Sequence, residues 1–348
     1  MQGEGGSSIR VVVADDSAVM RRMVGDALRR TPGIEVIGEA ADGDEALARC
    51  AELRPDALTL DLSMPGSTGL DVLARLREQR SPIRVVVVSA FSPTLVERAL
   101  DVLDAGATDL VAKPKVGESL QEFGDQVGRA VLAAAGQRGA ATRTPSVLVP
   151  RATRRASNDG RVLVIASSTG GPRALGELVP ALGSSIGAGG VIVQHMPEGF
   201  TAPLAARLDR ASALTVREAV EGDTLAPDHL FVAPAGTHLR ADGGRLSLDA
   251  SPPVGALRPR ADLTISDLVR EHGPRVVLAV LTGMGNDGLA GAKDVRAAGG
   301  IVLAQDESDC VVYGMPRHVV EHDLVDATGT LTELPVLIER ALGTPVPH

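Results

Sequence analysis

The first third of the chain carries side chains that together could bind a metal ion and accept a phosphoryl group. They are three aspartates, a serine and a lysine at the ends of predicted strands: Asp15, Asp16, Asp61, Ser89 and Lys113. Converging carboxylates repel one another and need a cation, and Mg²⁺ prefers such hard oxygen ligands. A metal-neutralised carboxylate beside a lysine and a hydroxyl can accept a phosphoryl group, because the cations balance charge on the transferring oxygens. The pattern predicts phosphorylation of Asp61, with all three aspartates as metal ligands.

A simpler interpretation exists for single members of this group. An aspartate at a strand end is more often a helix cap, and Asp15 or Asp16 could cap the helix predicted to begin at Ala18. The combination argues against this simpler role, since five suitable residues lie at four separate strand ends.

A second group, further along the chain, combines a serine, a histidine and an aspartate. Ser168 lies in a glycine-containing turn directly after a predicted strand, where a side chain stands exposed above a sheet and near a helix N-terminus. His195 ends the next predicted strand, and Asp287 lies in a glycine-rich loop after a third. These residue types supply a nucleophile, a general base and a carboxylate that orients the base. The sequence therefore predicts a catalytic site with a serine nucleophile.

Other roles remain open for each of these residues. The loop after residue 166 lacks the GK[ST] of a P-loop and the GxGxxG of a dinucleotide site, so a phosphate cradle is less favoured. Ser167 could cap the following helix, a lone histidine is commonly structural, and Asp287 alone would suit a helix N-cap. The local pattern Ala-x-Ser-x-Gly differs by one glycine from the GxSxG turn of α/β-hydrolases. The convergence of three residues on one edge favours catalysis.

The elements that would position the first group are alternating strands and helices. The buried apolar runs predicted as strands are 10–14, 35–40, 57–60, 84–88 and 109–112. The amphipathic stretches predicted as helices are 18–30, 44–53, 70–79, 93–105 and 118–135. This alternation implies a parallel sheet with helices on both faces, in which ligand sites lie at the carboxyl ends of the strands.

The second half of the chain repeats this class of fold. Its predicted strands are 161–166, 190–195, 275–281, 300–304 and 324–326. Its predicted helices are 172–182, 201–209, 287–298 and 334–342. Residues 229–249 differ, because short alternating runs with Pro-Ala-Gly and Asp-Gly-Gly predict an antiparallel β-hairpin insert. The predicted fold class is α/β, with two doubly wound parallel-sheet domains.

Composition limits the class of protein further. The chain has 348 residues, 44% of them hydrophobic, which is enough for two domains. With no Trp, one Tyr and four Phe, the cores must be aliphatic. Two cysteines far apart in sequence fit a reducing compartment, and no leader or long apolar run is present, so we expect a cytoplasmic protein without membrane insertion. The net charge of −9 argues against nucleic acid as the main partner.

The segment between the two predicted domains is basic and lacks periodicity. Residues 126–158 contain six arginines and no acidic residue. Residues 136–158 are rich in Gly, Ala, Thr, Pro and Ser, a composition that cannot bury an apolar face. We therefore expect domains at 9–125 and 159–345, joined by an arginine-rich linker.

The first domain resembles a two-component receiver domain, which has a flavodoxin-like fold. The matching motifs are ADDS at 14–17, LDLSMPGSTGLDVL at 60–73, VVSA at 87–90 and AKP at 112–114. The resemblance implies that Asp15 and Asp16 bind Mg²⁺ and that a histidine kinase phosphorylates Asp61. It also implies that Ser89 and Lys113 contact the phosphoryl group. One departure is Leu110, which stands where receivers usually carry an aromatic switch residue.

The second domain resembles the catalytic domain of chemotaxis protein-glutamate methylesterases, the CheB family. The matching motifs are SSTGGP at 167–172, QHMPEGFT at 194–201, LTGMGNDG at 281–288 and AQDESDCVVYGMP at 304–316. The resemblance implies a Rossmann-like domain with Ser168, His195 and Asp287 as the catalytic triad. Backbone N–H groups near Thr169 and Met284 are then candidates for the oxyanion hole. The implied reactions are hydrolysis of glutamate methyl esters and deamidation of glutamines.

Two departures from the CheB pattern are visible. The chain has ASS at 166–168 where the family usually has Gly-Ala-Ser, and LRPR at 257–260 where the family often has His-Arg-Pro-Ser. The triad positions are intact, and the central arginine of the second motif is kept. Arg258 and Phe200 are therefore candidates for substrate binding.

These observations predict a phosphorylation-activated hydrolase of a chemotaxis-type two-component pathway. We expect a histidine kinase as one partner and methylated cytoplasmic helices of chemoreceptors as substrate. Mg²⁺ is expected in the receiver, and no cofactor in the catalytic domain. The unphosphorylated receiver is expected to cover the Ser168 face. An adaptor that has lost its chemistry is the alternative, and a DNA-binding response regulator is less favoured because the second half lacks a basic patch and a helix-turn-helix pattern.

Overall fold

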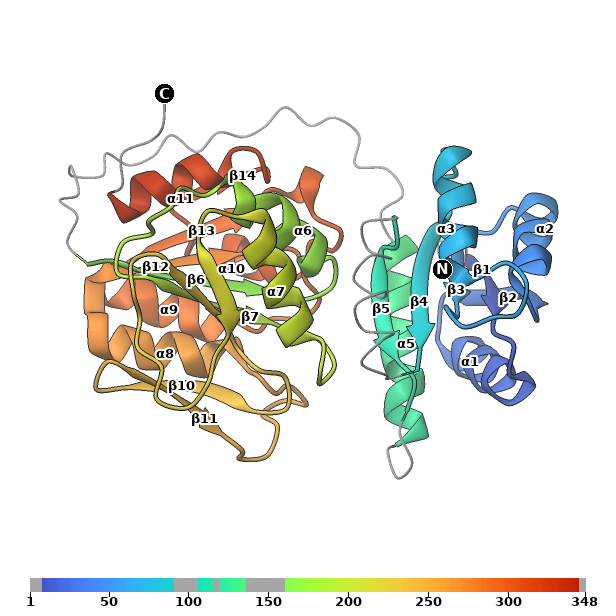
Figure 1. The fold of residues 1–348 in the computed structure, drawn as a ribbon, viewed down its shortest axis with the longest axis horizontal. Helices are drawn as coiled ribbons and strands as arrows, with labels where there is room; N and C mark the ends of the chain where they lie inside the picture. Colours follow the sequence, from blue (N-terminus) through green and yellow to red (C-terminus); the bar gives the residue numbers. More distant parts are fainter. Residues whose placement is uncertain (1–7, 91–105, 115–118, 136–159, 344–348) are drawn as a thin grey trace, which may run out of the picture. The chain divides into compact units, whose positions relative to one another are not determined.

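The computed structural model describes residues 8–90, 106–114, 119–135 and 160–343 (Figure 1). Contacts divide the chain into two compact units, Met1–Gly139 and Ala140–His348, each with a parallel sheet of its own. The predicted α/β class with two parallel sheets is thereby confirmed. Within the described ranges, no helix combines the length and apolar character that a membrane span requires.

The first unit has a five-stranded sheet in the order β2-β1-β3-β4-β5, and every neighbouring pair is parallel. The strands are β1 (Ile9–Ala14), β2 (Ile34–Ala40), β3 (Ala57–Leu60), β4 (Arg84–Ser89) and β5 (Asp109–Ala112). The described helices are α1 (Ala18–Arg30), α2 (Gly43–Leu53), α3 (Gly69–Glu78) and α5 (Leu120–Ala135). The helix predicted at 93–105 lies outside the described residues. Helix α5 continues past residue 125, the predicted end of the first domain.

Side chains that precede these helices explain where the helices begin. Ser17 caps α1 and accepts a hydrogen bond from Met20 N, so neither Asp15 nor Asp16 has the capping role. Asp42 caps α2 in the same way. Because Ser17 caps α1, the side chains of Asp15 and Asp16 are available to bind a ligand at the sheet edge.

The second unit has a seven-stranded parallel sheet in the order β14-β13-β12-β6-β7-β9-β8. The strands of this sheet are β6 (Val162–Ser167), β7 (Gly190–Gln194), β8 (Thr215–Glu218), β9 (His229–Val232), β12 (Val276–Val280), β13 (Ile301–Gln305) and β14 (Ala327–Gly329). The α-helices are α6 (Gly171–Leu178), α7 (Thr201–Ala211), α8 (Ala261–His272), α9 (Leu289–Ala297), α10 (Met315–Glu321) and α11 (Leu334–Leu342). Short 3-10 helices lie at Val179–Ala181, Gly273–Arg275 and Glu307–Asp309.

Two predictions for this unit are wrong in part. Only β10 (His238–Asp242) and β11 (Arg245–Asp249) form the antiparallel hairpin, whereas β9 joins the main sheet parallel to β7 because its apolar side chains are buried there. The strand predicted at 324–326 lies instead at Ala327–Gly329, while residues 324 and 325 pack at the margin of the core. Strand β8 and helices α8 and α10 were not predicted from the sequence.

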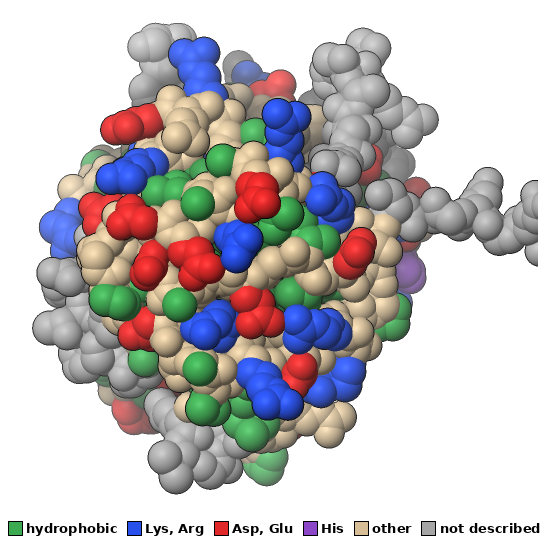
Figure 2. Space-filling model, turned by 90° about the vertical axis from the view of Figure 1, so that its right-hand side faces the viewer, with side chains coloured by type: hydrophobic (Ala, Val, Ile, Leu, Met, Phe, Trp, Pro, Cys, Tyr) green, Lys and Arg blue, Asp and Glu red, His purple; other side chains and the backbone are tan. Residues whose placement is uncertain are grey.

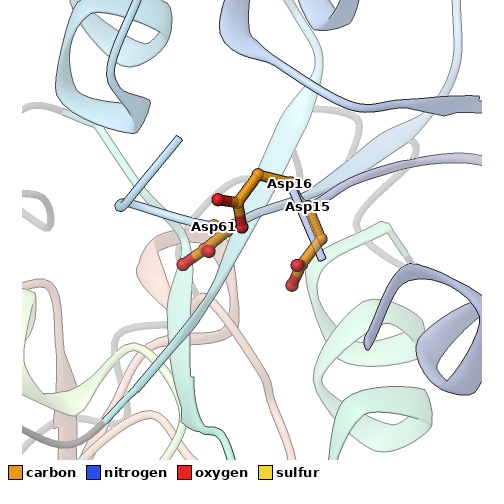
Figure 3. Close-up of side chains that lie close together, drawn as sticks. All are labelled: Asp15, Asp16 and Asp61. Carbon is orange, nitrogen blue, oxygen red and sulfur yellow. The ribbon is translucent and has the colours of Figure 1, made fainter. Parts of the chain in front are cut away.

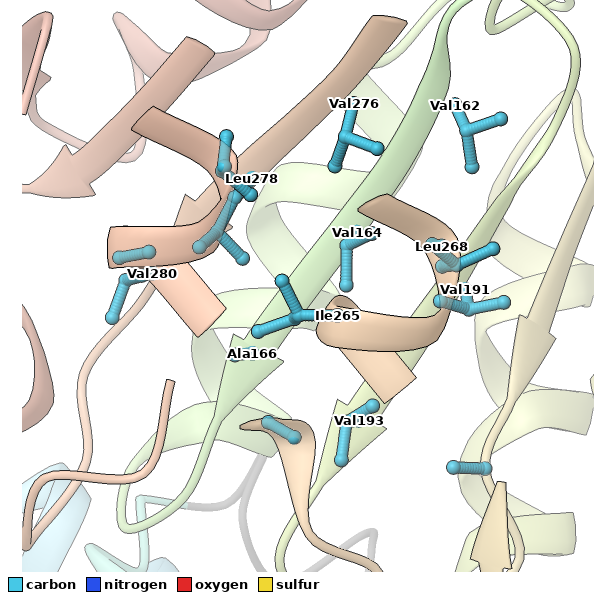
Figure 4. Packing of buried hydrophobic residues seen from close by; sticks show 14 of the residues in the cluster. Val162, Val164, Ala166, Val191, Val193, Ile265, Leu268, Val276, Leu278 and Val280 are labelled. Carbon is cyan, nitrogen blue, oxygen red and sulfur yellow. The ribbon is translucent and has the colours of Figure 1, made fainter. Parts of the chain in front are cut away.

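The core of the second unit forms between the sheet and α8 (Figure 4). Val162, Val164 and Ala166 alternate along β6 and therefore point to the same face. Ile265 and Leu268 of α8 pack on that face and are fully buried. Each buried aliphatic side chain of this size contributes about 1.5–3 kcal/mol. This packing fixes the N-terminus of α8 against the sheet, which matters for the site described below.

Charges of both signs are mixed on the surface seen in Figure 2. Lys and Arg side chains alternate there with Asp and Glu side chains. This face therefore shows no patch of one sign of the kind that a nucleic-acid backbone attracts.

Candidate functional sites

The first site lies at the carboxyl edge of the first sheet, where the three predicted aspartates meet (Figure 3). Asp15 and Asp16 follow β1, and Asp61 follows the neighbouring strand β3. Adjacent parallel strands end at the same edge, and oxygen atoms of the three carboxylates accordingly lie within 4.8 Å of one another. Asp15 and Asp61 are buried, whereas Asp16 is exposed. Oxygen ligands that are open to solvent on one side fit Mg²⁺, which keeps several of its waters.

Lys113 joins this site from the end of β5. Its Nζ lies 2.7 Å from Asp61 Oδ2 and 2.8 Å from Asp15 Oδ2. Burial lowers the pKa of Lys113, but the hydrogen bonds and charges of Asp15 and Asp61 outweigh burial and raise it. Burial raises the pKa of Asp15, against the opposing influence of Lys113. Two buried carboxylates share one ammonium group, so the electrostatics of the site favour a further cation.

Two buried oxygen atoms at this edge have no hydrogen-bond partner within the described parts of the chain. They are Asp61 Oδ1 and Ser89 Oγ. A buried polar atom without a partner costs free energy, so such atoms mark a place that a ligand can occupy. Leu110, at the position where an aromatic residue was expected from the resemblance, is half-buried on β5.

The second site lies at the carboxyl edge of the seven-stranded sheet. Strands β12, β6 and β7 are consecutive there, and Asp287, Ser168 and His195 follow them respectively. His195 Nε2 lies 2.7 Å from Asp287 Oδ2. The Ser168 N–H donates to Thr282 O, at 3.1 Å, in the loop that leads to Asp287. The described residues include no hydrogen bond between Ser168 Oγ and His195. Of the two side-chain hydrogen bonds expected among these three residues, the structure shows the one between His195 and Asp287.

Asp287 is almost completely buried and is held by the N-terminus of α8. Its Oδ2 accepts from Ala261 N at 2.7 Å, and its Oδ1 accepts from Asp262 N at 3.0 Å. Burial raises the pKa of Asp287, but the hydrogen bond and charge of His195, together with these backbone N–H groups, lower it to about 2. Asp287 is therefore ionised at neutral pH. It does not cap α9, whose N-cap residue is Gly288.

A buried glutamine connects the serine and histidine loops. Gln194 Oε1 accepts a hydrogen bond of 2.6 Å from Ser167 Oγ. Its Nε2 donates to Ser168 O at 2.9 Å and to His195 O at 2.7 Å. Ser167 therefore does not cap α6, whose N-cap residue is Gly170 without a side-chain bond. This role of Gln194 was not predicted from the sequence, where the available signal was its position next to His195 at a strand end.

The loop after β12 approaches the serine through Gly283. A Cβ atom on Gly283 would lie 2.7 Å from Ser168 Cβ and 2.5 Å from Met315 Sδ, so only glycine fits. Thr282 Oγ1 donates to Thr169 O at 3.0 Å and ties the same two loops. Among the described residues, the N–H groups of Thr169 and Met284 donate no hydrogen bond. Both groups therefore remain available as donors.

The two residues expected to bind substrate are placed differently. Arg258 lies in the loop before α8 and is half-buried, with Nη2 3.9 Å from Glu198 Oε1 in the loop that follows His195. Its Nη1 donates to Ser251 O at 3.3 Å. Phe200, by contrast, is 1% exposed and precedes α7. Its ring belongs to the interior and does not offer a surface to a substrate.

Comparison with known proteins matches both halves of the chain. Residues 163–338 match the family described as CheB methylesterase, and residues 11–123 match the response regulator receiver domain. A relative from Symbiobacterium thermophilum, named protein-glutamate methylesterase/protein-glutamine glutaminase, is 40% identical and covers 96% of this chain and 97% of its own. A relative from Myxococcus xanthus, with the same name and the number 5, is 41% identical and covers 96% of this chain and 98% of its own.

A solved structure is similar to the second unit. The crystal structure of the Thermotoga maritima CheB methylesterase catalytic domain is 40% identical, with a TM-score of 0.50, and covers 51% of this chain and 97% of that chain. The two domain matches occur in the order of the two sheets, and the relatives align over nearly the whole chain. The chain therefore belongs to the CheB methylesterase family and carries an N-terminal response regulator receiver domain.

Proposed function

We propose that the protein hydrolyses glutamate methyl esters on chemoreceptors, and deamidates glutamines there, under control of phosphorylation at Asp61. The observation that carries this proposal is the hydrogen bond of 2.7 Å between His195 and Asp287 at the sheet edge where Ser168 emerges. The names of the near-full-length relatives support the same reactions. The proposed receiver domain extends from residue 9 through the end of helix α5 at Ala135, and the proposed catalytic domain spans 159–345. The proposed partners of this cytoplasmic protein are a chemotaxis-type histidine kinase and methylated receptor helices.

In the proposed mechanism, Ser168 Oγ attacks the ester carbonyl. Nε2 of His195 is bound to Asp287, so Nδ1 is the ring atom left to take the serine proton. The ionised Asp287 fixes the ring and stabilises the imidazolium that forms. As the tetrahedral intermediate collapses and the bond from the carbonyl carbon to the leaving group breaks, His195 gives the proton to the methoxy oxygen, which departs as methanol, or to the amide nitrogen, which departs as ammonia. Water, activated by the same histidine, releases glutamate and restores Ser168.

The N–H groups of Thr169 and Met284 are proposed to stabilise the oxyanion of the tetrahedral intermediate. A well-placed donor of this kind contributes roughly 3–4 kcal/mol. No hydrogen bond engages either N–H within the described residues, and the hydrogen bonds of Thr282 to Ser168 N and Thr169 O hold their loops together. The two donors need no rearrangement of neighbouring hydrogen bonds before they act.

Replacing Gly283 by alanine should lower kcat/KM for ester hydrolysis about 10²-fold, because the added Cβ displaces the loop next to Ser168. The matched control is Gly176→Ala on α6, where the new Cβ meets only the flexible end of Arg207 at 3.4 Å. Methanol release by both variants and by wild type gives the comparison. Equal activities of the two variants would contradict the close-approach argument.

In the receiver, Asp61 is proposed to accept the phosphoryl group from the kinase. Asp15, Asp16 and Asp61 would hold Mg²⁺, which supplies positive charge that offsets the charge of the transferring oxygens. Lys113 is already hydrogen-bonded to Asp61 and would move that bond to a phosphoryl oxygen. The hydroxyl of Ser89, without a partner in the described residues, would donate to another. The added charge of about −1.5 to −2 is proposed to relieve inhibition of the catalytic domain.

The experiment that tests the esterase proposal measures methanol released from methylated receptor by the full chain. Ser168→Ala should abolish release, and Ser184→Ala, an exposed serine outside the site, should leave it intact. A serine-reactive fluorophosphonate should label Ser168 in wild type. Full activity of Ser168→Ala would exclude the mechanism, and absence of labelling would favour an adaptor without chemistry.

A further inference from the structure

A second buried aspartate lies beside Asp287. Asp262, at the start of α8, is 7% exposed, and its Oδ1 accepts hydrogen bonds of 2.9 Å from Gly288 N and Gly291 N. The Gly288 N–H also lies 3.0 Å from Asp287 Oδ1, so the two carboxylates share one donor. Burial raises the pKa of Asp262, and the negative charge of Asp287 raises it further. Two negative charges in one buried place require a nearby cation.

Arg260 supplies a cation to both carboxylates. Its Nη2 donates to Asp262 Oδ2 at 2.8 Å, and its Nε lies 3.6 Å from Asp287 Oδ1. Its Nη1 donates to Val254 O at 3.1 Å, in the loop that continues to Arg258. The side chain is 19% exposed, so water screens these contacts only in part. A guanidinium in a protein stays protonated, so this positive charge is permanent.

We propose that Arg260 is a positioning residue that sets how readily the His195–Asp287 pair takes up a proton, and that holds the pair in place. The inference rests on the proposed function, since it concerns the same site. Two buried carboxylates near an imidazole favour the protonated ring, which cannot accept the serine proton. The charge of Arg260 offsets one of the two carboxylates. Loss of the Arg260 charge should therefore favour the protonated form of the pair.

The charged groups that face the pair come from two neighbouring elements. His195 faces Asp287 from the end of β7, and Arg260 and Asp262 approach from the start of α8. The partners from the α9 side are backbone N–H groups. Within residues 160–343, no other charged side chain forms an ion pair with Asp262 or Asp287. Charge changes at 260 and 262 should therefore act on this pair in opposite directions.

The test is the pH dependence of Ser168 labelling by a fluorophosphonate in the full-length protein, which reports on the base without a substrate. Arg260→Gln should move the acid-side midpoint of the labelling rate upward by about half to one pH unit. Asp262→Asn should move the midpoint downward, and the double variant should return close to wild type. The acid side of kcat/KM for ester hydrolysis should follow the same order.

A matched control is an arginine on β10 that pairs with an aspartate of the same helix, α8. Arg240 Nε lies 2.6 Å from Asp267 Oδ2, and the Asp267 side chain is 3% exposed, so this pair also joins an arginine to a buried aspartate of α8. Arg240 has no ion pair with Asp287 among the described residues. Arg240→Gln should lower Tm as a lost buried ion pair does, and should leave the acid-side midpoint in place.

An unchanged midpoint in Arg260→Gln, or an equal shift in Arg240→Gln, would overturn the proposal. If Arg260→Gln does not fold, Arg260→Lys decides the matter. Lysine keeps the charge and should keep the wild-type midpoint, while the labelling rate should fall several-fold because one ammonium cannot reach Val254 O and both carboxylates together. A wild-type rate in that variant would overturn the positioning role. Failure of the proposed function gives a different result, namely no labelling of Ser168 in the wild type itself.

Discussion

Replacing Asp287 by asparagine should lower kcat for methanol release about 10³–10⁴-fold, with a much smaller change in KM. Asp287 accepts hydrogen bonds with both oxygens, from Ala261 N and His195 Nε2 on Oδ2 and from Asp262 N on Oδ1. An asparagine amide has one oxygen and one NH₂ group. An NH₂ group at the Oδ1 position would face Asp262 N, and one at the Oδ2 position would face both Ala261 N and His195 Nε2. An NH₂ group that donates to Nε2 places the ring proton on Nδ1, where it blocks acceptance of the serine proton.

The pH dependence of activity distinguishes this orienting role of Asp287 from an effect of its own protonation. The pKa of Asp287 is lowered to about 2 by His195 and the backbone donors, against the effect of burial. Its negative charge is therefore lost only as the pH falls through about 2. If the activity of the wild type falls as the pH is lowered from 7 to 5, protonation of Asp287 should not be the cause.

The control for this substitution is Asp294→Asn on α9, an exposed aspartate that accepts a hydrogen bond from Ser266 Oγ. It makes the same chemical change in the same unit without touching His195. Its activity should match wild type at every pH measured. A tenfold or smaller loss of kcat in Asp287→Asn would contradict the orienting role of the carboxylate.

The positions of the side chains proposed to react could be predicted from the sequence because each follows a buried apolar run. A strand in a parallel sheet ends at a defined edge, so a residue such as Asp61 or Ser168 is located once its strand is recognised. The strand predicted at 324–326 was wrong by a short distance because the apolar pair at 324 and 325 packs beside the sheet instead of within it. The register of a short edge strand depends on its neighbour, and the sequence does not contain that information by itself.

The residues that hold the second site in place could not be predicted from strand ends. The α8 donors of Asp287 lie about 26 positions earlier in the chain, and they reach it only because Ile265 and Leu268 seat that helix on the sheet. Gln194 has no motif chemistry of its own, since its role comes from the backbone carbonyls that surround it. Parallel pairing of β9 also depends on a neighbour, β7, that lies far away in sequence. Such contacts follow from tertiary packing and not from local pattern.

Asp61→Asn should abolish both phosphorylation by acetyl phosphate with Mg²⁺ and the rise in ester hydrolysis that accompanies it. Asp61 Oδ2 is 2.7 Å from Lys113 Nζ, and Asp61 Oδ1 is buried without a hydrogen-bond partner in the described residues. Lys113 therefore orients one oxygen of this carboxylate, and the other oxygen is available to accept the phosphoryl group. Asparagine keeps the size of the side chain but cannot form an acyl phosphate. Radioactive phosphate incorporation and methanol release, measured on the same samples, give both readouts.

Substitutions of two other aspartates in the same unit test whether the effect is specific to Asp61. Asp125→Asn changes an exposed aspartate of α5 in the same unit and should leave phosphate incorporation and activation unchanged. Asp16→Asn removes one exposed carboxylate of the proposed metal site. It should therefore raise the Mg²⁺ concentration needed for half-maximal phosphate incorporation without removing the phosphoryl acceptor. If acetyl phosphate still activates Asp61→Asn, the Asp61 carboxylate is not the group through which phosphorylation regulates ester hydrolysis. Activation lost in Asp61→Asn alone, with basal hydrolysis intact, would place Asp61 upstream of Ser168 as a switch and not as part of the hydrolytic site.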